Sequence, residues 1–348
     1  MTKTPSAPRI SVVCPTYNRS RAITSTLDSV RAQAVTDWEL LVVSDGSTDD
    51  TDDWVRRAAD EDARIRLIRA ERHGHPSGPR NIGLAEARSE FVAYLDHDDR
   101  WREEHLQLLL SVLGTGADLV ATGFECRDMS EGVTSRSDVL DLCWHPEIQL
   151  LGPMFEPSRV AHRRRLADRV GGWRPGDGLE DWDLWLRMAD DSVRFSTVRD
   201  RSALLLDDRG TRRHRTVRRH RLQLAVFDDP RHARAALGEL RHERHEAAFR
   251  EAYAADTIAW YERMQATAQF TAPLGWQGDL SAEIARAAEK PGPLWPDLVV
   301  VPGQGRYVLA QPLWCPTAEH ARRIEELVRR VQRRQLDLIA EIAAECTP

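Results

Sequence analysis

Short apolar runs alternate with amphipathic segments through the first third of the chain. The apolar runs cover residues 10–14, 38–43, 65–68 and 91–95. Continuous runs of this kind are typical of buried strands in a parallel sheet. Between the first two runs, Ile23, Leu27 and Val30 share one face at helical spacing. The alternation predicts an α/β fold, with a mostly parallel sheet and helices on both of its faces.

The pattern of hydrophobic and polar positions changes in the last third of the chain. Residues 232–264 and 317–344 are long, charged and periodic, which predicts helices. Residues 298–313 hold two strand-like runs around a Pro-Gly-Gln-Gly turn, which predicts a hairpin. We therefore expect an α/β domain over residues 1–221 and a mainly helical C-terminal module over residues 222–348. The apolar stripe of the last helix suits an acceptor platform or a dimer surface, so a homodimer is one expectation.

Composition narrows the class of protein. The chain has 348 residues and a net charge of −6, which argues against a general nucleic-acid-binding protein. Its five cysteines are scattered without a Cys-x-x-Cys spacing, so neither a zinc site nor a disulfide framework is expected, and a reducing compartment fits best. No apolar stretch is long enough to span a bilayer. We therefore expect a cytoplasmic protein without a transmembrane segment.

The fourth apolar run ends in three carboxylates within four residues, Asp96, Asp98 and Asp99. Carboxylates this close repel one another unless a cation lies among them. Strand ends in α/β sheets are also where ligands bind, so the pattern suggests a divalent metal with phosphate oxygens as its remaining ligands. Asp96 and Asp98 are the favoured ligands. The alternative is a polar turn that caps a helix beginning near Arg102.

Polar residues follow the other strands at the same edge of the predicted sheet. Tyr17 could stack on a nucleobase or cover it, Asp45 could accept a hydrogen bond from a base edge, and Arg80 could balance phosphate charge. Each of these three residues could instead be an ordinary turn residue without a binding role. The sequence has no Gly-x-Gly-x-x-Gly after the first strand and no Gly-Lys-Ser/Thr P-loop. A metal and arginines would therefore have to hold the phosphates.

Several motifs taken together resemble those of the family 2 glycosyltransferases, which have the GT-A fold. The motifs are Pro-Thr-Tyr-Asn-Arg at 15–19, Val-Ser-Asp-Gly-Ser-Thr-Asp at 43–49, Gly-Pro-Arg-Asn-x-Gly at 78–83, Leu-Asp-His-Asp-Asp at 95–99, and Glu180-Asp181. The resemblance covers roughly residues 9–215 and leaves the C-terminal module out. It implies an inverting transfer of a sugar from a nucleoside diphosphate, commonly UDP, with Mg²⁺ or Mn²⁺ as cofactor.

The resemblance also implies roles for individual residues. Contacts to the donor nucleotide are expected from Pro15, Thr16, Tyr17, Asn18, Asp45, Arg80 and Asp96. Asp98, together with Asp96, would coordinate the metal, and Asp181 would be the catalytic base that takes the acceptor's proton. His214, in the arginine-rich stretch 209–221, would contact a phosphate or the metal. Ser44 departs from the family, because many members have an aspartate there.

The acceptor side is less closely defined. Glu180 and Trp101 are the candidates for contacts to the acceptor. The Gln-x-x-Arg-Trp motif of processive polysaccharide synthases is absent, so we expect transfer of a single hexosyl or N-acetylhexosaminyl unit. UDP-glucose and UDP-N-acetylglucosamine are the first donors to consider. The acceptor could be a small natural product, a glycan precursor or a peptide side chain.

Two other functions stay open at this point. The chain could be a nucleotide-sugar-binding protein that has lost catalysis, although its intact Asp-x-Asp and Glu-Asp motifs argue against that. It could also bind nucleic acid through residues 209–221, which contain seven arginines and no acid. The net acidity of the chain argues against this second alternative.

Overall fold

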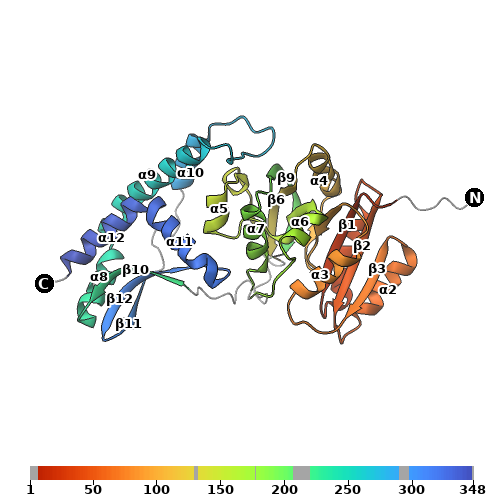
Figure 1. Ribbon diagram of the computed structural model, residues 1–348, viewed down its shortest axis with the longest axis horizontal. Helices are drawn as coiled ribbons and strands as arrows, with labels where there is room; N and C mark the ends of the chain where they lie inside the picture. The colour runs from red at the N-terminus through yellow and green to blue at the C-terminus, as the bar shows by residue number, and fades with distance from the viewer. Residues whose placement is uncertain (1–6, 129–131, 177, 207–219, 290–297, 347–348) are drawn as a thin grey trace, which may run out of the picture. The chain divides into compact units, whose positions relative to one another are not determined.

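The computed structural model describes residues 7–128, 132–176, 178–206, 220–289 and 298–346. The chain divides into two compact units, whose elements are labelled in Figure 1. The first unit comprises Met1–Gln149, Pro153–Thr216 and Thr271–Trp276. The second comprises Leu150–Gly152, Val217–Phe270 and Gln277–Pro348. Each unit has a sheet and a buried apolar core of its own.

The first unit is built on one sheet of strand order β3-β2-β1-β4-β8-β6-β9-β5, with β7 paired to β6. One half of it consists of four parallel strands, β1 (Ile10–Thr16), β2 (Trp38–Asp45), β3 (Ile65–Ala70) and β4 (Phe91–Tyr94). These strands form where the four apolar runs predicted them. Because β2 and β4 flank β1 on opposite sides, the strand order reverses there, and a crevice for a ligand opens at the carboxyl ends of β1 and β4.

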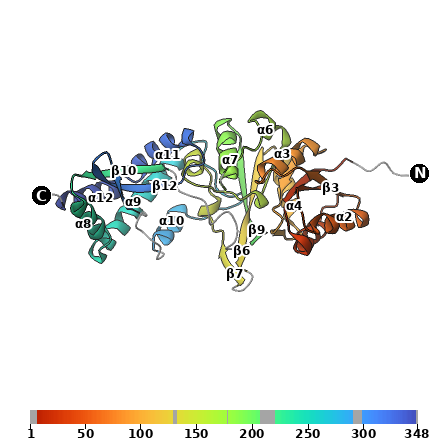
Figure 2. The ribbon, with the colours of Figure 1, turned by 90° about the horizontal axis from the view of Figure 1, so that it is seen from below.

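The other half of this sheet mixes strand directions. Its strands are β5 (Arg100–Trp101), β6 (Leu119–Asp128), β7 (Gly132–Arg136), β8 (Val160–Arg163) and β9 (Phe195–Leu206). β8 runs antiparallel to both β4 and β6 and so joins the two halves, whereas β6 and β9 are parallel to each other. Figure 2 shows that the β6–β7 hairpin extends past the rest of the sheet.

Helices cover both faces of the sheet, as the alternating pattern predicted. The helices α1 (Thr24–Arg31), α2 (Thr51–Glu61) and α4 (His105–Gly114) pack in one apolar cluster with side chains such as Val12 and Cys14 of β1. On the opposite face, α3 (Ser77–Glu86), α6 (Arg164–Arg169) and α7 (Glu180–Asp190) pack in a second cluster that contains Val13. Short turns of helix lie at Ser20–Ile23, Leu140–Leu142, Pro146–Leu151 and Pro157–Arg159.

Two contacts fix helix α3 closely in the first unit. A Cβ atom added to Gly83 would lie 2.4 Å from Val13 Cγ1, so only glycine allows the helix to approach β1 this closely. Asn81 forms a reciprocal pair with the backbone of Trp173, since its Nδ2 donates to the Trp173 oxygen and its Oδ1 accepts from the Trp173 nitrogen, both at 2.8 Å. The helix therefore positions the segment that leads into α7.

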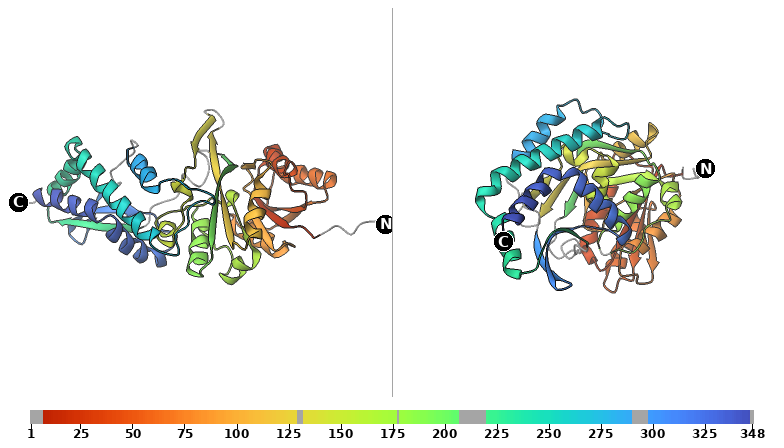
Figure 3. Two further views of the ribbon diagram at one scale, coloured as in Figure 1. Left: turned by 90° about the horizontal axis from the view of Figure 1, so that it is seen from above. Right: turned by 60° about the vertical axis from the view of Figure 1, so that its left-hand side comes forward.

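The second unit combines a small antiparallel sheet with helices. The sheet has the order β10-β12-β11, formed by His220–Phe227, Arg306–Leu313 and Val299–Gly303. The helices are α8 (Pro230–Leu240), α9 (Glu246–Gln265), α10 (Leu280–Glu289), α11 (Ala318–Val331) and α12 (Arg333–Glu345), with a short turn at Glu243–His245 between α8 and α9. Figure 3 shows α9 beside α12, and both helices supply side chains to the core of this unit.

The helices of this unit differ in detail from the prediction. The single closing helix expected over residues 317–344 is two helices, because the chain breaks at Gln332 between α11 and α12. Asp256 of α9 is the physical reason, since its carboxylate accepts hydrogen bonds from the backbone nitrogens of Arg334 and Gln335, both at 3.2 Å. These two amides belong to the first turn of α12, where backbone nitrogens have no partner within the helix. In one continuous helix they would instead bond to carbonyl oxygens of the preceding turn.

Within the described ranges, no helix combines the length and the apolar character needed to cross a membrane.

Candidate functional site

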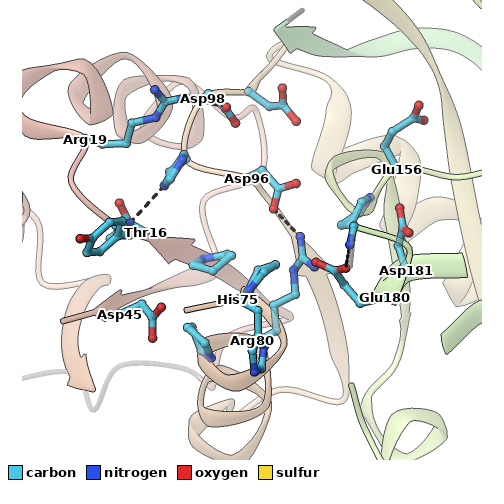
Figure 4. Close-up of a pocket in the computed structure, with 18 of the residues that line it drawn as sticks. Thr16, Arg19, Asp45, His75, Arg80, Asp96, Asp98, Glu156, Glu180 and Asp181 are labelled. Atoms are coloured by element: carbon cyan, nitrogen blue, oxygen red, sulfur yellow. Dashed lines mark hydrogen bonds and ion pairs between the residues drawn. The ribbon is translucent and has the colours of Figure 1, made fainter. Parts of the chain in front are cut away.

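A pocket of about 540 Å³ opens in the first unit at the carboxyl end of the parallel strands (Figure 4). It brings together side chains from the end of β2, from the loops after β1, β3 and β4, from the start of α3 and from the start of α7. Among them are most of the residues that the sequence analysis selected, namely Pro15, Thr16, Tyr17, Asp45, Arg80, Asp96, Asp98, Glu180 and Asp181. Parallel strands end at one edge of a sheet, so motifs far apart in sequence meet there.

Asp45 lies at the end of β2, and its carboxylate holds the segment after β3. Its Oδ1 accepts hydrogen bonds from the backbone nitrogen and the Nδ1 of His73, at 2.7 and 3.1 Å. Its Oδ2 accepts from the backbone nitrogen of Gly74 at 3.0 Å and from the guanidinium of Arg72. Burial by itself would raise the pKa of Asp45, but these donors hold it below the usual value of an aspartate.

Tyr17 and Asn18, in the loop after β1, are tied to neighbouring loops. The Arg72 guanidinium lies 3.4 Å from the centre of the Tyr17 ring, and the backbone nitrogen of Tyr17 donates to His97 Nδ1 at 3.3 Å. Burial lowers the pKa of His97, so its ring is neutral and Nδ1 can accept. Asn18 has a left-handed φ of 46°, and its Oδ1 accepts from the backbone nitrogen of Thr48 at 2.8 Å. Asn18 therefore joins two loops.

The carboxylates that follow β4 have different environments. Asp98 Oδ2 lies 2.6 Å from Arg19 Nη2, and Asp96 Oδ1 lies 2.6 Å from Arg80 Nη2. Asp99 is buried, and its oxygens accept from the Ser158 hydroxyl at 2.5 Å and from the Leu206 backbone nitrogen at 2.8 Å. Burial, and then the charges of Asp98 and Asp96, raise the pKa of Asp99 well above its usual range. Asp99 therefore stabilises the loop after β4 through these two hydrogen bonds.

The donor chemistry of this loop suits a hard divalent cation. Over the part of the chain that the structure describes, no group of three or more histidine, cysteine or acidic side chains is arranged to hold a metal ion. Mg²⁺ sites of phosphate-transfer proteins commonly use only one or two carboxylates together with substrate phosphates. Asp96 and Asp98, two carboxylates at the rim of one pocket, fit that kind of site.

Arg80 is a buried cation at the floor of the pocket. It is 3% exposed, and its guanidinium lies 4.4 Å from the centre of the Trp173 ring. Although burial opposes its charge, the carboxylates of Asp96 and Glu180 raise the pKa of Arg80. Its Nε has no hydrogen-bond partner among the described residues. Arg80 therefore places a permanent positive charge between the Asp96 loop and helix α7.

Helix α7 begins at the pocket with two acidic residues. Glu180 is 5% exposed and accepts from the Gly178 backbone nitrogen at 3.0 Å. Asp181 Oδ1 accepts from the Trp182 backbone nitrogen at 2.7 Å. Burial, and then the charge of Glu180, raise the pKa of Asp181 to about 7. A carboxylate that gains and loses its proton near neutral pH is suited to general base catalysis.

The family model of Glycosyl transferase family 2 matches residues 11–165, which contain β1 to β8 and the pocket residues from Pro15 to Pro157. Residues 11–165 are therefore similar to the glycosyl transferase family 2 domain. The remainder of the pocket, with Glu180 and Asp181, lies just beyond the matched region.

Curated relatives match this chain over parts of their length. The protein y4gI of Sinorhizobium fredii is 32% identical over 183 residues, which is 52% of this chain and 20% of that protein. The UDP-Glc:alpha-D-GlcNAc-diphosphoundecaprenol beta-1,3-glucosyltransferase WfgD of Escherichia coli is 36% identical over 104 residues, 30% of this chain and 40% of that protein. The chain spans less than half the length of these relatives.

A solved structure supports the fold of the chain. The crystal structure of S. aureus TarS 1-349 in complex with UDP-GlcNAc covers 68% of this chain and 67% of that chain, with a TM-score of 0.51 and 21% identity. At this identity the likeness establishes the fold alone. The chain has the α/β GT-A fold with a helical C-terminal part that the sequence predicted.

Two of the predicted site residues do not line the pocket, and a third lies outside the described residues. Asn18 links the loops after β1 and β2. Trp101 is 4% exposed, stacks on His105 with ring centres 4.4 Å apart, and donates from Nε1 to the Ser158 oxygen at 2.6 Å. Trp101 thus packs in the interior beside His105, away from the pocket lining. His214 lies outside the described residues.

Sequence reasoning missed several residues that line the pocket. Arg19, Arg72, His75, His97 and Glu156 all border it. A signal for two of them was available, because Arg72 and His75 come shortly after β3, at the edge of the sheet where β2 ends with Asp45. Glu156 follows an irregular stretch, and no periodicity or motif marks it.

Proposed function

We propose that the protein transfers a single sugar from a UDP-sugar to an acceptor, with inversion at the anomeric carbon and with the help of Mg²⁺ or Mn²⁺. The observation that carries this proposal is one pocket in which Asp96, Asp98 and Arg80, from the region that matches family 2, meet Asp181, which lies just beyond that region. The pKa of Asp181, which burial and then the charge of Glu180 raise to about 7, supports its assignment as the general base.

The charge of the pocket supports the use of a cation. Among the described residues, seven carboxylates and three guanidiniums line it, so these residues by themselves would repel a diphosphate. Asp96 and Asp98 would hold the metal, and Arg19 and Arg80, now paired with them, would turn toward phosphate oxygens. The bound metal would offset the negative charge that develops on the departing diphosphate.

The proposed reaction is one in-line displacement. An acceptor hydroxyl would approach the anomeric carbon from the side opposite the diphosphate. Asp181 would take the hydroxyl proton as the new carbon–oxygen bond forms, while the bond to the diphosphate oxygen breaks and UDP leaves. Arg80 would stabilise the departing phosphate, and Glu180 would hold the acceptor or the start of α7. The proton that Asp181 receives would pass to solvent before the next cycle.

Relatives support the choice of donor and of acceptor class. The E. coli relative WfgD is named for transfer of glucose from UDP-Glc to a diphosphoundecaprenol-linked sugar, and a Campylobacter jejuni relative, 34% identical over 110 residues, is named as a glucosyltransferase acting on a PP-undecaprenol glycan. We therefore propose UDP as the nucleotide and, of the three acceptor classes, a glycan precursor.

The metal and nucleotide parts of this proposal can be tested with two single variants. Asp98→Ala removes a proposed metal ligand, whereas Asp53→Ala removes an exposed carboxylate of α2 and is the matched control. UDP binding is measured calorimetrically with and without Mn²⁺. We expect Mn²⁺ to strengthen UDP binding by wild type and by Asp53→Ala, and Asp98→Ala to lose at least tenfold of that gain. Unchanged Mn²⁺-dependent UDP binding in Asp98→Ala would overturn the metal assignment.

A further inference from the structure

Two buried hydroxyl groups from separate parts of the chain hold the loop that carries the proposed metal ligands. The loop comprises residues 96–99, between β4 and β5. One hydroxyl belongs to Ser158 and the other to Thr26, and both side chains are 0% exposed. Because a hydroxyl shielded from water finds its hydrogen-bond partners within the protein, each of these contacts restricts the loop.

The Ser158 hydroxyl joins the two ends of this loop. It accepts a hydrogen bond from the Asp96 backbone nitrogen at 3.0 Å and donates one to Asp99 Oδ2 at 2.5 Å. A serine hydroxyl has a single hydrogen to donate, and here Asp99 accepts it. Asp98, a proposed metal ligand, lies between the two bonded residues. The Ser158 hydroxyl therefore fixes Asp96 relative to Asp99 and limits where Asp98 can lie.

Thr26, in α1, holds the backbone of the same loop. Its Oγ1 donates to the carbonyl oxygens of His97 and Asp99, at 3.1 and 2.9 Å. These two residues come directly before and after Asp98 in the sequence. A bond from the Asp99 nitrogen to the Asp96 oxygen, at 3.0 Å, closes the turn between them. The backbone on both sides of Asp98 is therefore held in place.

Ser158 is itself held by bonds to the sheet. It lies in the short turn before β8, and because β8 runs antiparallel to β4, this turn lies beside the end of β4. The Ser158 carbonyl oxygen accepts from Trp101 Nε1 at 2.6 Å. The next residue, Arg159, donates from Nε to the Thr122 oxygen of β6 at 2.7 Å. These bonds restrict the movement of the Ser158 hydroxyl.

A fixed loop matters more for some ions than for others. Mg²⁺ requires a near-ideal octahedron of oxygen ligands at about 2.0–2.1 Å, whereas Ca²⁺ accepts variable geometry with oxygen ligands at about 2.3–2.6 Å. Ligands are held in a precise geometry only when the residues around them restrict their movement. Release of the loop that carries Asp96 and Asp98 would therefore weaken Mg²⁺ binding more than Ca²⁺ binding.

We propose that Ser158 is a positioning residue which, together with Thr26, fixes the loop of Asp96 and Asp98 so that it favours Mg²⁺ over Ca²⁺. This inference rests on the proposed function, since it concerns the metal of the same site. Ser158 does not line the pocket. It acts through its bonds to Asp96 and Asp99, so its effect on metal binding is transmitted through the loop.

The test compares the two ions in matched serine variants. UDP binding is measured calorimetrically without metal, with Mg²⁺ and with Ca²⁺, for wild type, Ser158→Ala, Ser158→Thr and Ser89→Ala. Ser89 provides the control, because it is also buried and its hydroxyl donates to the Phe91 oxygen at 2.8 Å. It precedes β4 and so lies at the opposite end of that strand from the loop.

The expected result is a loss that depends on the ion. We expect Ser158→Ala to lose about tenfold of the UDP affinity that Mg²⁺ adds, but less than about twofold of what Ca²⁺ adds. Metal-free UDP binding is expected to stay unchanged. Ser158→Thr keeps the hydroxyl and is expected to recover most of the effect of Mg²⁺, and Ser89→Ala is expected to behave as wild type.

A second variant keeps the test decisive if Ser158→Ala does not fold. Thr26→Val removes the other hydroxyl with little change of side-chain shape, and we expect it to lose the effect of Mg²⁺ in the same selective way. Thermal unfolding of each variant shows which proteins are folded at the temperature of the binding measurement.

The outcomes also separate this inference from the proposed function. If neither ion strengthens UDP binding by wild type, the metal part of the proposed function fails and this inference fails with it. If Mg²⁺ strengthens binding by wild type and Ser158→Ala keeps the full effect, only this inference is overturned. An equal loss with both ions in Ser158→Ala would show that the hydroxyl merely supports the loop, and would overturn its role in ion preference.

Discussion

At the scale of single residues, Asp181 illustrates how function and stability oppose each other. Burial, and then the charge of Glu180, raise its pKa to about 7, whereas an aspartate in the unfolded chain ionises near pH 4. The native state therefore binds more protons than the unfolded state between about pH 4 and 7. Over that window the contribution of Asp181 to stability falls as pH rises, and the full cost of its ionisation is present above pH 7.

This linkage predicts that Asp181→Asn stabilises the protein at alkaline pH. The amide is never ionised, so the variant avoids that cost. We expect its thermal midpoint to exceed that of wild type by a few degrees at pH 8 and to differ little at pH 5. Asp190→Asn, which alters an exposed aspartate at the other end of α7, serves as the control. An equal effect of Asp181→Asn at both pH values would contradict the raised pKa.

Many of the residues that line the pocket could be predicted from the sequence. Tyr17, Asp45 and Asp96 each end or follow a recognisable strand, Arg80 lies in the helix after β3, and the ends of parallel strands meet at one edge. What each side chain contacts could not be predicted. The hydrogen bonds that Asp45 accepts come from residues 72–74, which are distant in sequence and reach Asp45 only because β3 pairs beside β2.

At the scale of elements, helix α3 shows how packing positions the site. It carries Arg80 into the pocket and, through Asn81, holds the segment before α7. Its closeness to β1 depends on Gly83, because a side chain there would collide with Val13. A small displacement of this helix would move Arg80 and the start of α7 together.

Two glycine substitutions test this packing directly. Gly83→Ala forces a methyl group to within 2.4 Å of Val13 Cγ1 and is expected to reduce the free energy of unfolding by about 1–3 kcal/mol. Gly114→Ala, at the end of α4, meets no atom within 4 Å and is expected to raise it by about 0.4–1 kcal/mol. Urea unfolding followed by tryptophan fluorescence measures both. Equal stability of the two variants would contradict the close approach of α3.

Sequence patterns predicted which helices and strands form better than they predicted where each one begins and ends. The four parallel strands and the hairpin at β11 and β12 agree with the patterns from which they were predicted. The break at Gln332 was missed because the apolar spacing continues across it, and the cause, Asp256, lies in another helix. Strand β10 was missed because its exposed positions interrupt its apolar residues and it pairs with a distant strand, β12.

At the scale of the whole molecule, the chain order does not follow the division into units. Residues 271–276 return to the first unit after part of the second has been formed. Thr271 exchanges backbone hydrogen bonds with Trp144, and the Leu274 nitrogen donates to the Thr197 oxygen at 2.9 Å. A composition change near residue 222 indicates that a second unit begins but carries no sign of this return, because backbone pairing leaves no residue pattern.

The central proposal is that the first unit, which contains the region similar to family 2, is a glycosyltransferase whose base is Asp181. The most direct test measures UDP release from UDP-glucose and UDP-N-acetylglucosamine with Mn²⁺, by wild type and by Asp181→Asn, with UDP affinity measured in parallel. We predict that wild type releases UDP from at least one donor and that Asp181→Asn binds UDP equally well but turns over about 10²–10⁴-fold more slowly. Wild-type turnover in Asp181→Asn, or no turnover of either donor by wild type, would contradict the claim.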